Sequence, residues 1–195
     1  MEPESANRVT AAAAPNTFEV SPGVAEFNMP ISEYMRLNPS ISRLAVGAMI
    51  FSGNHIMLIQ RASHDFAPLM WEVPGGACEA NKDATILHSV SRELWEETGL
   101  RLRSVKKHVD NVEFDDGRQH ALTWRKITFE VEVDEGHGLG PAERRDVISA
   151  AVKLNPTEHR GWGWAQMAEV EEGKGGKQFM ELQRSTILAA LNAAR

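Results

Sequence analysis

Residues 83–98 read DATILHSVSRELWEET, and Gly99 follows them directly. Apolar residues in this stretch recur at helical spacing, which places them within one arc of about 100° on an α-helix. The residues on this arc are Ile86, Leu87, Val90 and Leu94. A glycine directly after a helical pattern is a typical helix end. The spacing therefore predicts a helix over 83–98 that packs this arc against the rest of the protein.

The same helix carries three glutamates along one edge of its apolar arc, Glu93, Glu96 and Glu97. Carboxylates at these spacings repel one another unless solvent or a cation screens them. A solvated acidic stripe is the commoner interpretation of a glutamate-rich helix. Here the edge turns toward the protein, and Pro74-Gly75-Gly76 brings bare backbone close to it. These two features favour a divalent-metal site, and hard oxygen ligands suit Mg²⁺ or Mn²⁺.

The segments around this helix have the pattern of strands. Two apolar runs, 42–51 and 56–61, flank a short polar turn and predict a hairpin. A short strand at 71–73 ends at Pro74, where strand pairing cannot continue. Further strands are expected at 102–112, 121–133 and 162–165, and further helices at 143–152 and 179–194. This order predicts an α+β fold rather than a doubly wound parallel sheet.

Length and composition indicate one compact domain. The chain has 195 residues, of which 42% are hydrophobic and 25% charged, as in ordinary globular proteins. Residues 1–20 have no hydrophobic period and are expected to form a flexible tail. The domain is expected over 21–195.

Charge and cysteine content exclude several classes of partner and location. A net charge of −6 argues against a nucleic-acid duplex, which requires clustered Lys and Arg. No apolar run reaches the roughly 18 residues of a membrane span. The acidic start of the sequence does not fit a secretory signal. Cys78 is the only cysteine, so no intrachain disulfide forms, and a reducing, cytoplasmic location is expected.

Residues 92–100, RELWEETGL, resemble the C-terminal half of the Nudix box, R-E-U-x-E-E-x-G-U, where U is a bulky aliphatic residue. Every fixed position of that half is met. Together with the preceding Pro-Gly-Gly turn and the surrounding strands, the resemblance covers roughly residues 40–170. It implies an α/β/α sandwich with a mixed sheet. It also implies a Mg²⁺-dependent hydrolase that cleaves a diphosphate bond in a small molecule, such as a nucleoside diphosphate linked to a second group.

The first half of the box, G-x5-E-x7-R, departs from the family pattern. Fifteen residues separate Gly76 from Arg92, where the box has thirteen. Counting back from Arg92 therefore places the first glutamate of the box on Ala84. Asp83 or Glu79 could replace it after a loop adjustment.

The resemblance implies a set of site residues. Glu93, Glu96 and Glu97 are expected to bind metal with a backbone carbonyl from Gly75 or Gly76, and the expected catalytic acids are Glu96, Glu97 and Glu158. Glu158 resembles an acid that often precedes the last strand of Nudix enzymes, although an exposed loop glutamate is the simpler interpretation. Arg92 can clamp Glu96 or, with Arg125 and Arg160, contact substrate phosphates. Solvated charges are the alternative for these arginines.

Two other functions remain open at this point. The first is an isoprenoid-diphosphate enzyme, but isomerases of this fold need a catalytic cysteine and Cys78 is no obvious match. The second is a Nudix-fold module that binds a nucleotide or partner without turnover, which Ala84 and the longer loop support. The complete set of helix glutamates argues against it. Among the aromatic residues, Trp71, Trp162 and Trp164 could stack on a base, but core packing is favoured.

Overall fold

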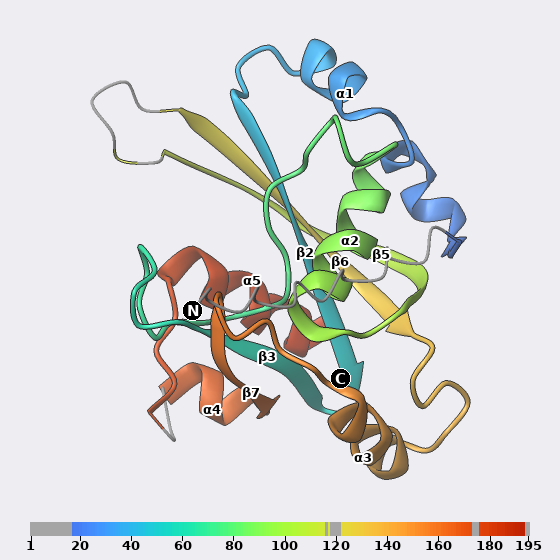
Figure 1. Cartoon of the computed structure of the whole chain (residues 1–195), viewed down its shortest axis with the longest axis vertical. Helices are drawn as coiled ribbons and strands as arrows, with labels where there is room; N and C mark the ends of the chain where they lie inside the picture. The colour runs from blue at the N-terminus through green and yellow to red at the C-terminus, as the bar shows by residue number, and fades with distance from the viewer. Residues whose placement is uncertain (1–16, 116, 118–121, 173–175, 194–195) are drawn as a thin grey trace, which may run out of the picture.

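The computed structural model describes residues 17–115, 117, 122–172 and 176–193. The strands are β1 (Glu19–Val20), β2 (Arg43–Ser52), β3 (His55–Arg61), β4 (Trp71–Glu72), β5 (Leu102–Asp115), β6 (Thr123–Val133) and β7 (His159–Ala165). The helices are η1 (Pro22–Phe27), α1 (Ile31–Leu37), α2 (Ile86–Thr98), α3 (Pro141–Ala151), α4 (Met167–Glu172) and α5 (Glu181–Ala193). Figure 1 shows β2 running through the middle of the molecule. Within these ranges no helix is long and apolar enough to cross a membrane.

The strands form a mixed sheet in the order β1-β5-β6-β2-β3-β4, and β7 pairs with β3. Strand β2 runs parallel to β6, from Arg43 opposite Trp124 to Ile50 opposite Val131. It pairs with β3 only at the hairpin end, where Phe51 faces Ile56. Strand β2 therefore joins two groups of strands.

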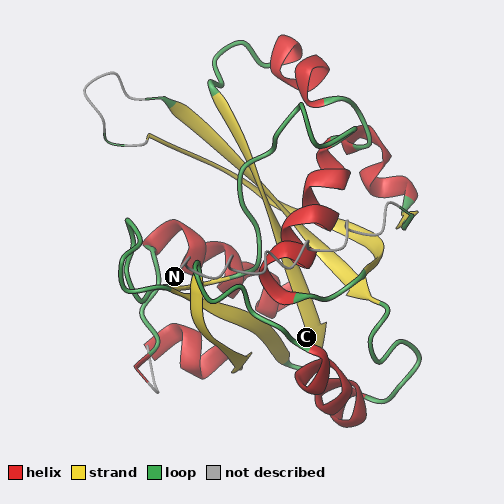
Figure 2. Ribbon diagram, in the orientation of Figure 1, coloured by secondary structure: helices red, strands yellow, loops and turns green. Residues whose placement is uncertain are grey.

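Two hydrophobic cores lie on either side of this sheet. Along β2, Val46, Ala48 and Ile50 pack in the core that includes α2, η1 and α1. Met49 points the other way and packs in the core that includes α4 and α5. This alternation follows from the two-residue period of a strand. The result is the expected α/β/α sandwich, whose helices flank the sheet in Figure 2.

Helix α2 confirms the expected core face but starts later than the sequence predicts. Its four apolar arc residues are all buried. The helix begins after Thr85, whose side chain accepts a hydrogen bond from the His88 N–H. Asp83 stays outside, because its carboxylate accepts the Glu79 N–H at 2.9 Å and binds Arg92. The long loop thus extends to residue 85 and holds Asp83 in place.

The N-terminal boundary of the domain lies earlier than composition suggests. Residues 1–16 are outside the described ranges, but 17–20 are ordered against the domain. Strand β1 pairs parallel with β5. The Phe18 ring lies edge-on to the His88 ring, with centroids 5.2 Å apart. Residues 17–20 therefore belong to the folded unit and not to a tail.

Candidate active site

The three helix glutamates differ sharply in exposure. Glu93 and Glu97 are 9% and 6% exposed, whereas Glu96 lies on the solvent side of α2. This difference follows from the helical wheel, because Glu97 projects onto the same face as the core residues. Two of the three acids thus face the interior of the protein.

Arg92 joins the acids of α2 to the loop before it. Its Nε and Nη2 donate to the two carboxylate oxygens of Asp83, both at 2.8 Å. Its Nη1 donates to Glu93 at 2.8 Å and to Glu96 at 3.0 Å, and Nη2 also donates to the Ala77 carbonyl. Asp83, the residue before Ala84, is therefore the loop acid that pairs with Arg92. The N–H donors of Arg92 are thus occupied by the protein, which fits the clamp of Glu96 expected from sequence and leaves no donor for a substrate phosphate.

The Pro74-Gly75-Gly76 turn lies directly on the acids. The Gly75 N–H donates to Glu97 Oε2 at 2.6 Å. At Gly75, φ is 151° and a Cβ would overlap the Val46 carbonyl oxygen. At Gly76, a Cβ would lie 2.7 Å from the Glu93 carboxylate. Only glycine permits this close approach of backbone and carboxylates.

A second group of polar residues, outside the site predicted from sequence, lies around Glu97. Glu72 on β4 is buried and accepts from Arg61 at 2.5 Å. His159, the first residue of β7, is also buried, and its Nε2 lies 3.7 Å from Glu72 and 3.6 Å from Glu97. The imidazole therefore stands between two carboxylates. A charged residue between Trp71 and Val73 in an apolar strand was the available sequence signal for Glu72.

Burial sets unequal pKa values for these acids. Desolvation, with repulsion from Glu96 and Glu158, raises the pKa of Glu93 to about 7 against the attraction of Arg92. Burial and the nearby Glu72 raise the pKa of Glu97 well above its usual range. Burial also opposes ionisation of Glu72. There the nearby His159 and the charges of Lys126 and Arg61 outweigh the effect of burial and lower the pKa of Glu72.

These groups line one cavity of about 850 Å³. Glu93, Glu97, Gly75 and Gly76 line it, as does the exposed Glu158. One ligand atom each from Glu97, Glu158 and His159 lies within 4.8 Å of the others. The structure thus brings the loop acid to the helix acids. Carboxylates on one wall of an open cavity can hold a divalent cation and expose it to a substrate.

Two arginines expected at the substrate lie elsewhere. Arg125 on β6 donates to Tyr34 at 2.9 Å, to Asn38 at 2.7 Å and to Glu113 at 2.6 Å. Its neighbour on the strand, Lys126, points into the cavity instead. Arg160 is exposed and is not part of the cavity lining. The alternation along each strand separates these arginines from the site.

The three tryptophans considered from sequence pack against the cores, as expected. Trp162 and Trp164 pack against the first core, and Trp71 packs against the second. A different tryptophan, Trp124 on β6, lines the acidic cavity. No role was assigned to it from the sequence.

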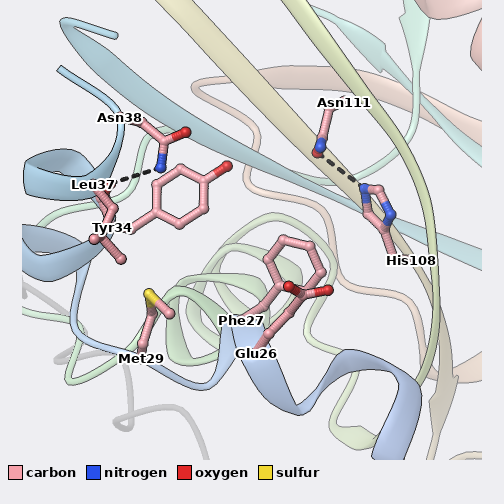
Figure 3. Close-up of a pocket in the computed structure, with 8 residues that line it drawn as sticks. All are labelled: Glu26, Phe27, Met29, Tyr34, Leu37, Asn38, His108 and Asn111. Atoms are coloured by element: carbon pink, nitrogen blue, oxygen red, sulfur yellow. Dashed lines mark hydrogen bonds between the residues drawn. The ribbon is translucent and has the colours of Figure 1, made fainter. Parts of the chain in front are cut away.

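A smaller cavity of about 370 Å³ lies between η1, α1 and β5. Figure 3 shows Phe27, Tyr34 and His108 around it, with the His108 ring hydrogen-bonded to Asn111. None of the glutamates of α2 lines it. The larger cavity, which the glutamates of α2 line, is therefore the candidate active site.

Comparisons with known proteins identify the family and the fold. The sequence profile of the NUDIX domain matches residues 41–183. No curated protein matches the sequence. Among solved structures, a MutT NUDIX hydrolase from Burkholderia pseudomallei is 18% identical with a TM-score of 0.56, covering 74% of this chain and 95% of that one. A NUDIX hydrolase from Nitrosomonas europaea is 20% identical with a TM-score of 0.57, covering 78% and 90%.

The NUDIX domain of Shewanella oneidensis NrtR, solved with ADP ribose, is 17% identical with a TM-score of 0.57 and covers 86% of this chain and 100% of that one. At these identities the solved structures establish the fold, and the profile match over most of the chain establishes the family. The protein therefore belongs to the NUDIX domain family.

Proposed function

We propose that this protein is a hydrolase that uses Mg²⁺, or Mn²⁺ in its place, to cleave the diphosphate bond of a small molecule. A nucleoside diphosphate linked to a second group is the first candidate. The observation that carries the proposal is the convergence of Glu93, Glu97 and Glu158 on one cavity beside a Gly-Gly turn. The ADP ribose bound by the Shewanella oneidensis domain supports the substrate class.

The residues present fit a divalent cation. Glu93 and Glu97 are buried carboxylates. Burial removes the water that would stabilise their ionised forms, and the surrounding protein does not fully replace it, so their pKa values are raised. Gly76 leaves the Glu93 carboxylate open to the cavity because it has no side chain. When bound, Mg²⁺ would neutralise charge on the diphosphate and lower the pKa of water. Glu93, Glu97 and the exposed Glu96 would hold it, with a carbonyl of the Gly-Gly turn.

The other residues orient these ligands and handle protons. Arg92 fixes Glu93 and Glu96, and Asp83 in turn fixes Arg92. The Gly75 N–H fixes one oxygen of Glu97. Glu158 is exposed within the cavity and can accept a proton from an attacking water, which makes it our candidate for the general base.

The two alternative functions have less support in the site. Burial raises the pKa of Cys78 to about 12, so its thiol stays protonated, which disfavours a cysteine-dependent isomerase. A binding module without turnover drew its support from Ala84 and the longer loop. Asp83 is held by Arg92 and can serve as the supporting acid, which weakens the support from Ala84. A cytoplasmic location stays a prediction.

A panel of diphosphates tests the proposal. The panel contains nucleoside diphosphate sugars, dinucleoside polyphosphates, nucleoside triphosphates and prenyl diphosphates, each assayed with Mg²⁺, with Mn²⁺ and with a chelator. We expect phosphate or nucleotide release with Mg²⁺ and loss of that release with the chelator. Hydrolysis that persists unchanged in the chelator, or none across the panel with either metal, would contradict it.

The metal-free protein should lose stability as pH rises from about 4.5 to 7. The pKa of Glu93 is raised to about 7 in the folded state from an ordinary 4.5, so the folded state holds a proton that the unfolded state releases. The stabilisation that comes from the Glu93 proton is therefore fully present below pH 4.5. It is lost as pH rises through 7, which lowers the free energy of unfolding by up to about 3 kcal/mol. Glu97 acts in the same direction.

Urea unfolding in the presence of a chelator, repeated across this pH range, measures the effect. Glu93→Gln should reduce the change in the free energy of unfolding with pH. Glu143→Gln, a change at an exposed glutamate of α3, should leave it as in the wild type. Equal slopes for Glu93→Gln and the wild type would show that the Glu93 pKa is not raised.

A further inference from the structure

Part of the cavity wall comes from elements that carry none of the metal-binding acids. Val112 and Phe114 on β5 lie opposite Lys126 and Trp124 on β6. The Phe114 and Trp124 rings are stacked, with an interplanar angle of 11° and centroids 6.2 Å apart. Helix α5 completes this wall with Leu182, Gln183 and Thr186. This wall is largely aromatic and apolar. It belongs to the same cavity as the acidic residues and adjoins them.

Gln183 is held in one orientation on this wall. Its side chain is buried, with 7% of the residue exposed. Lys126 Nζ donates to Gln183 Oε1 at 3.1 Å, and an ammonium group can only donate. The contact therefore fixes which end of the amide is oxygen, and the other end must be the NH₂ group. Among the described residues no acceptor lies within hydrogen-bond distance of that Nε2 atom.

A second buried N–H donor on the same wall also lacks an acceptor among the described residues. The indole N–H of Trp124 is buried, and no acceptor in the described part of the chain reaches it. The hydroxyl of Thr186 is already engaged with Asp110 at 2.7 Å. The carboxylates on this wall, Asp115 and Glu181, are exposed to solvent. Arg61 and His159, which line the same cavity, also have buried side-chain nitrogens without a partner among the described residues. Buried donors are nearly always paired in folded proteins, so the two unpaired donors on this wall indicate a ligand that brings acceptors.

We propose that this wall binds the base of a nucleotide substrate, and that Gln183 and Trp124 select bases with a ring carbonyl over bases with an amino group in its place. The inference rests on the proposed function, since the base must belong to the molecule whose diphosphate is cleaved. A planar base fits a wall of stacked aromatic rings. A carbonyl oxygen accepts from Gln183 Nε2, whereas an amino group there would set donor against donor.

The same donors argue against a prenyl substrate in this cavity. A hydrocarbon tail would cover the wall but leave both N–H groups buried and unpaired. Sites built to hydrogen-bond a substrate reject analogues that lack the partner atom far more strongly than apolar pockets reject a change of size. Lys126 strengthens the choice, because it prevents the Gln183 amide from turning its oxygen toward the ligand.

Matched nucleotides test the selection directly. Inosine and adenosine triphosphates exchange a carbonyl for an amino group at C6, and uridine and cytidine triphosphates do so at C4. With Mg²⁺, the full chain should hydrolyse the carbonyl member of each pair with a kcat/KM at least roughly tenfold higher, as expected for one mismatched hydrogen bond. Equal values, or a preference for adenosine and cytidine, would overturn the inference.

Substitutions at Gln183 give a sharper outcome. Gln183→Glu replaces the donor with an acceptor while Lys126 compensates its charge, so the ratio within each pair should shift toward the amino-bearing base. Gln178→Glu makes the same chemical change at an exposed residue outside the cavity and should keep the wild-type ratio. Unshifted ratios in folded Gln183→Glu would contradict the role of Gln183.

A melting curve shows whether Gln183→Glu folds, and Gln183→Met provides the alternative if it does not. The methionine removes the donor without adding charge, so the ratio should fall toward one. Trp124→Phe keeps the ring, removes the N–H and should lower the same ratio.

The two proposals can fail separately. Hydrolysis of prenyl diphosphates with no nucleotide hydrolysed would leave the proposed reaction intact and overturn this inference. If no diphosphate is hydrolysed, calorimetry with inosine and adenosine triphosphates decides. Tighter binding of inosine triphosphate would support the base site, and equal binding would overturn it.

Discussion

Replacing Glu97 by glutamine is expected to lower turnover by roughly 100-fold or more at saturating Mg²⁺, the effect of removing one well-placed electrostatic contact of about 3 kcal/mol. Glutamine keeps the shape and can still accept the Gly75 N–H. It removes the charge that a bound cation requires. The loss should appear mainly in kcat, because a metal stabilises charge that develops in the transition state.

The same substitution should not weaken the metal-free protein. Burial and Glu72 already raise the pKa of Glu97, so a neutral side chain relieves an unfavourable charge. The melting temperature of Glu97→Gln, measured in a chelator, should equal that of the wild type or exceed it. Glu143→Gln, far from the acids on exposed α3, is the control and should change neither property. Wild-type activity for Glu97→Gln across a Mg²⁺ titration would refute the metal-binding role of this helix.

Replacing Arg92 by leucine is expected to produce the largest loss of stability, about 3–5 kcal/mol. The guanidinium is buried and neutralises Asp83 and Glu93 at 2.8 Å each. Without it both carboxylates are left in the interior without their charge partner. Chemical denaturation of the metal-free protein at pH 7 measures the difference in the free energy of unfolding.

A surface arginine serves as the matched control. Arg103→Leu breaks longer ion pairs, 3.7 Å to Glu19 and 3.5 Å to Asp134, on a partly exposed side chain. It should cost less than about 1 kcal/mol. If Arg92→Leu fails to fold, Asp83→Asn tests the same network, since it removes only the charge that holds Arg92. A loss below 1 kcal/mol for both Arg92→Leu and Asp83→Asn would show that the network does not stabilise the fold.

The local pattern of the sequence determined the central part of this protein. Helical spacing identified the buried face of α2, and the same wheel placed Glu97 at its inner edge. The Pro-Gly-Gly turn indicated close backbone approach, which the Gly75 hydrogen bond to Glu97 now shows. These features could be predicted because they depend on residues within one element or on conformations that only glycine allows.

The remaining features depend on contacts between residues far apart in the chain. Glu72 and His159 meet Glu97 only because β4 and β7 both pair with β3. Arg125 turned away from the site and Lys126 into it because the register of β6 against β2 assigns each residue to one face.

Sequence alone also could not place Gln183 beside Lys126, since nothing in the periodicity of α5 specifies its partner on β6. It also left open whether Asp83 or Glu79 lies beside Arg92, and in the structure Asp83 accepts two of its hydrogen bonds. Periodicity encodes which face of an element is apolar. The packing of one element on another decides which polar side chains share a cavity, because that depends on register and the direction of each chain.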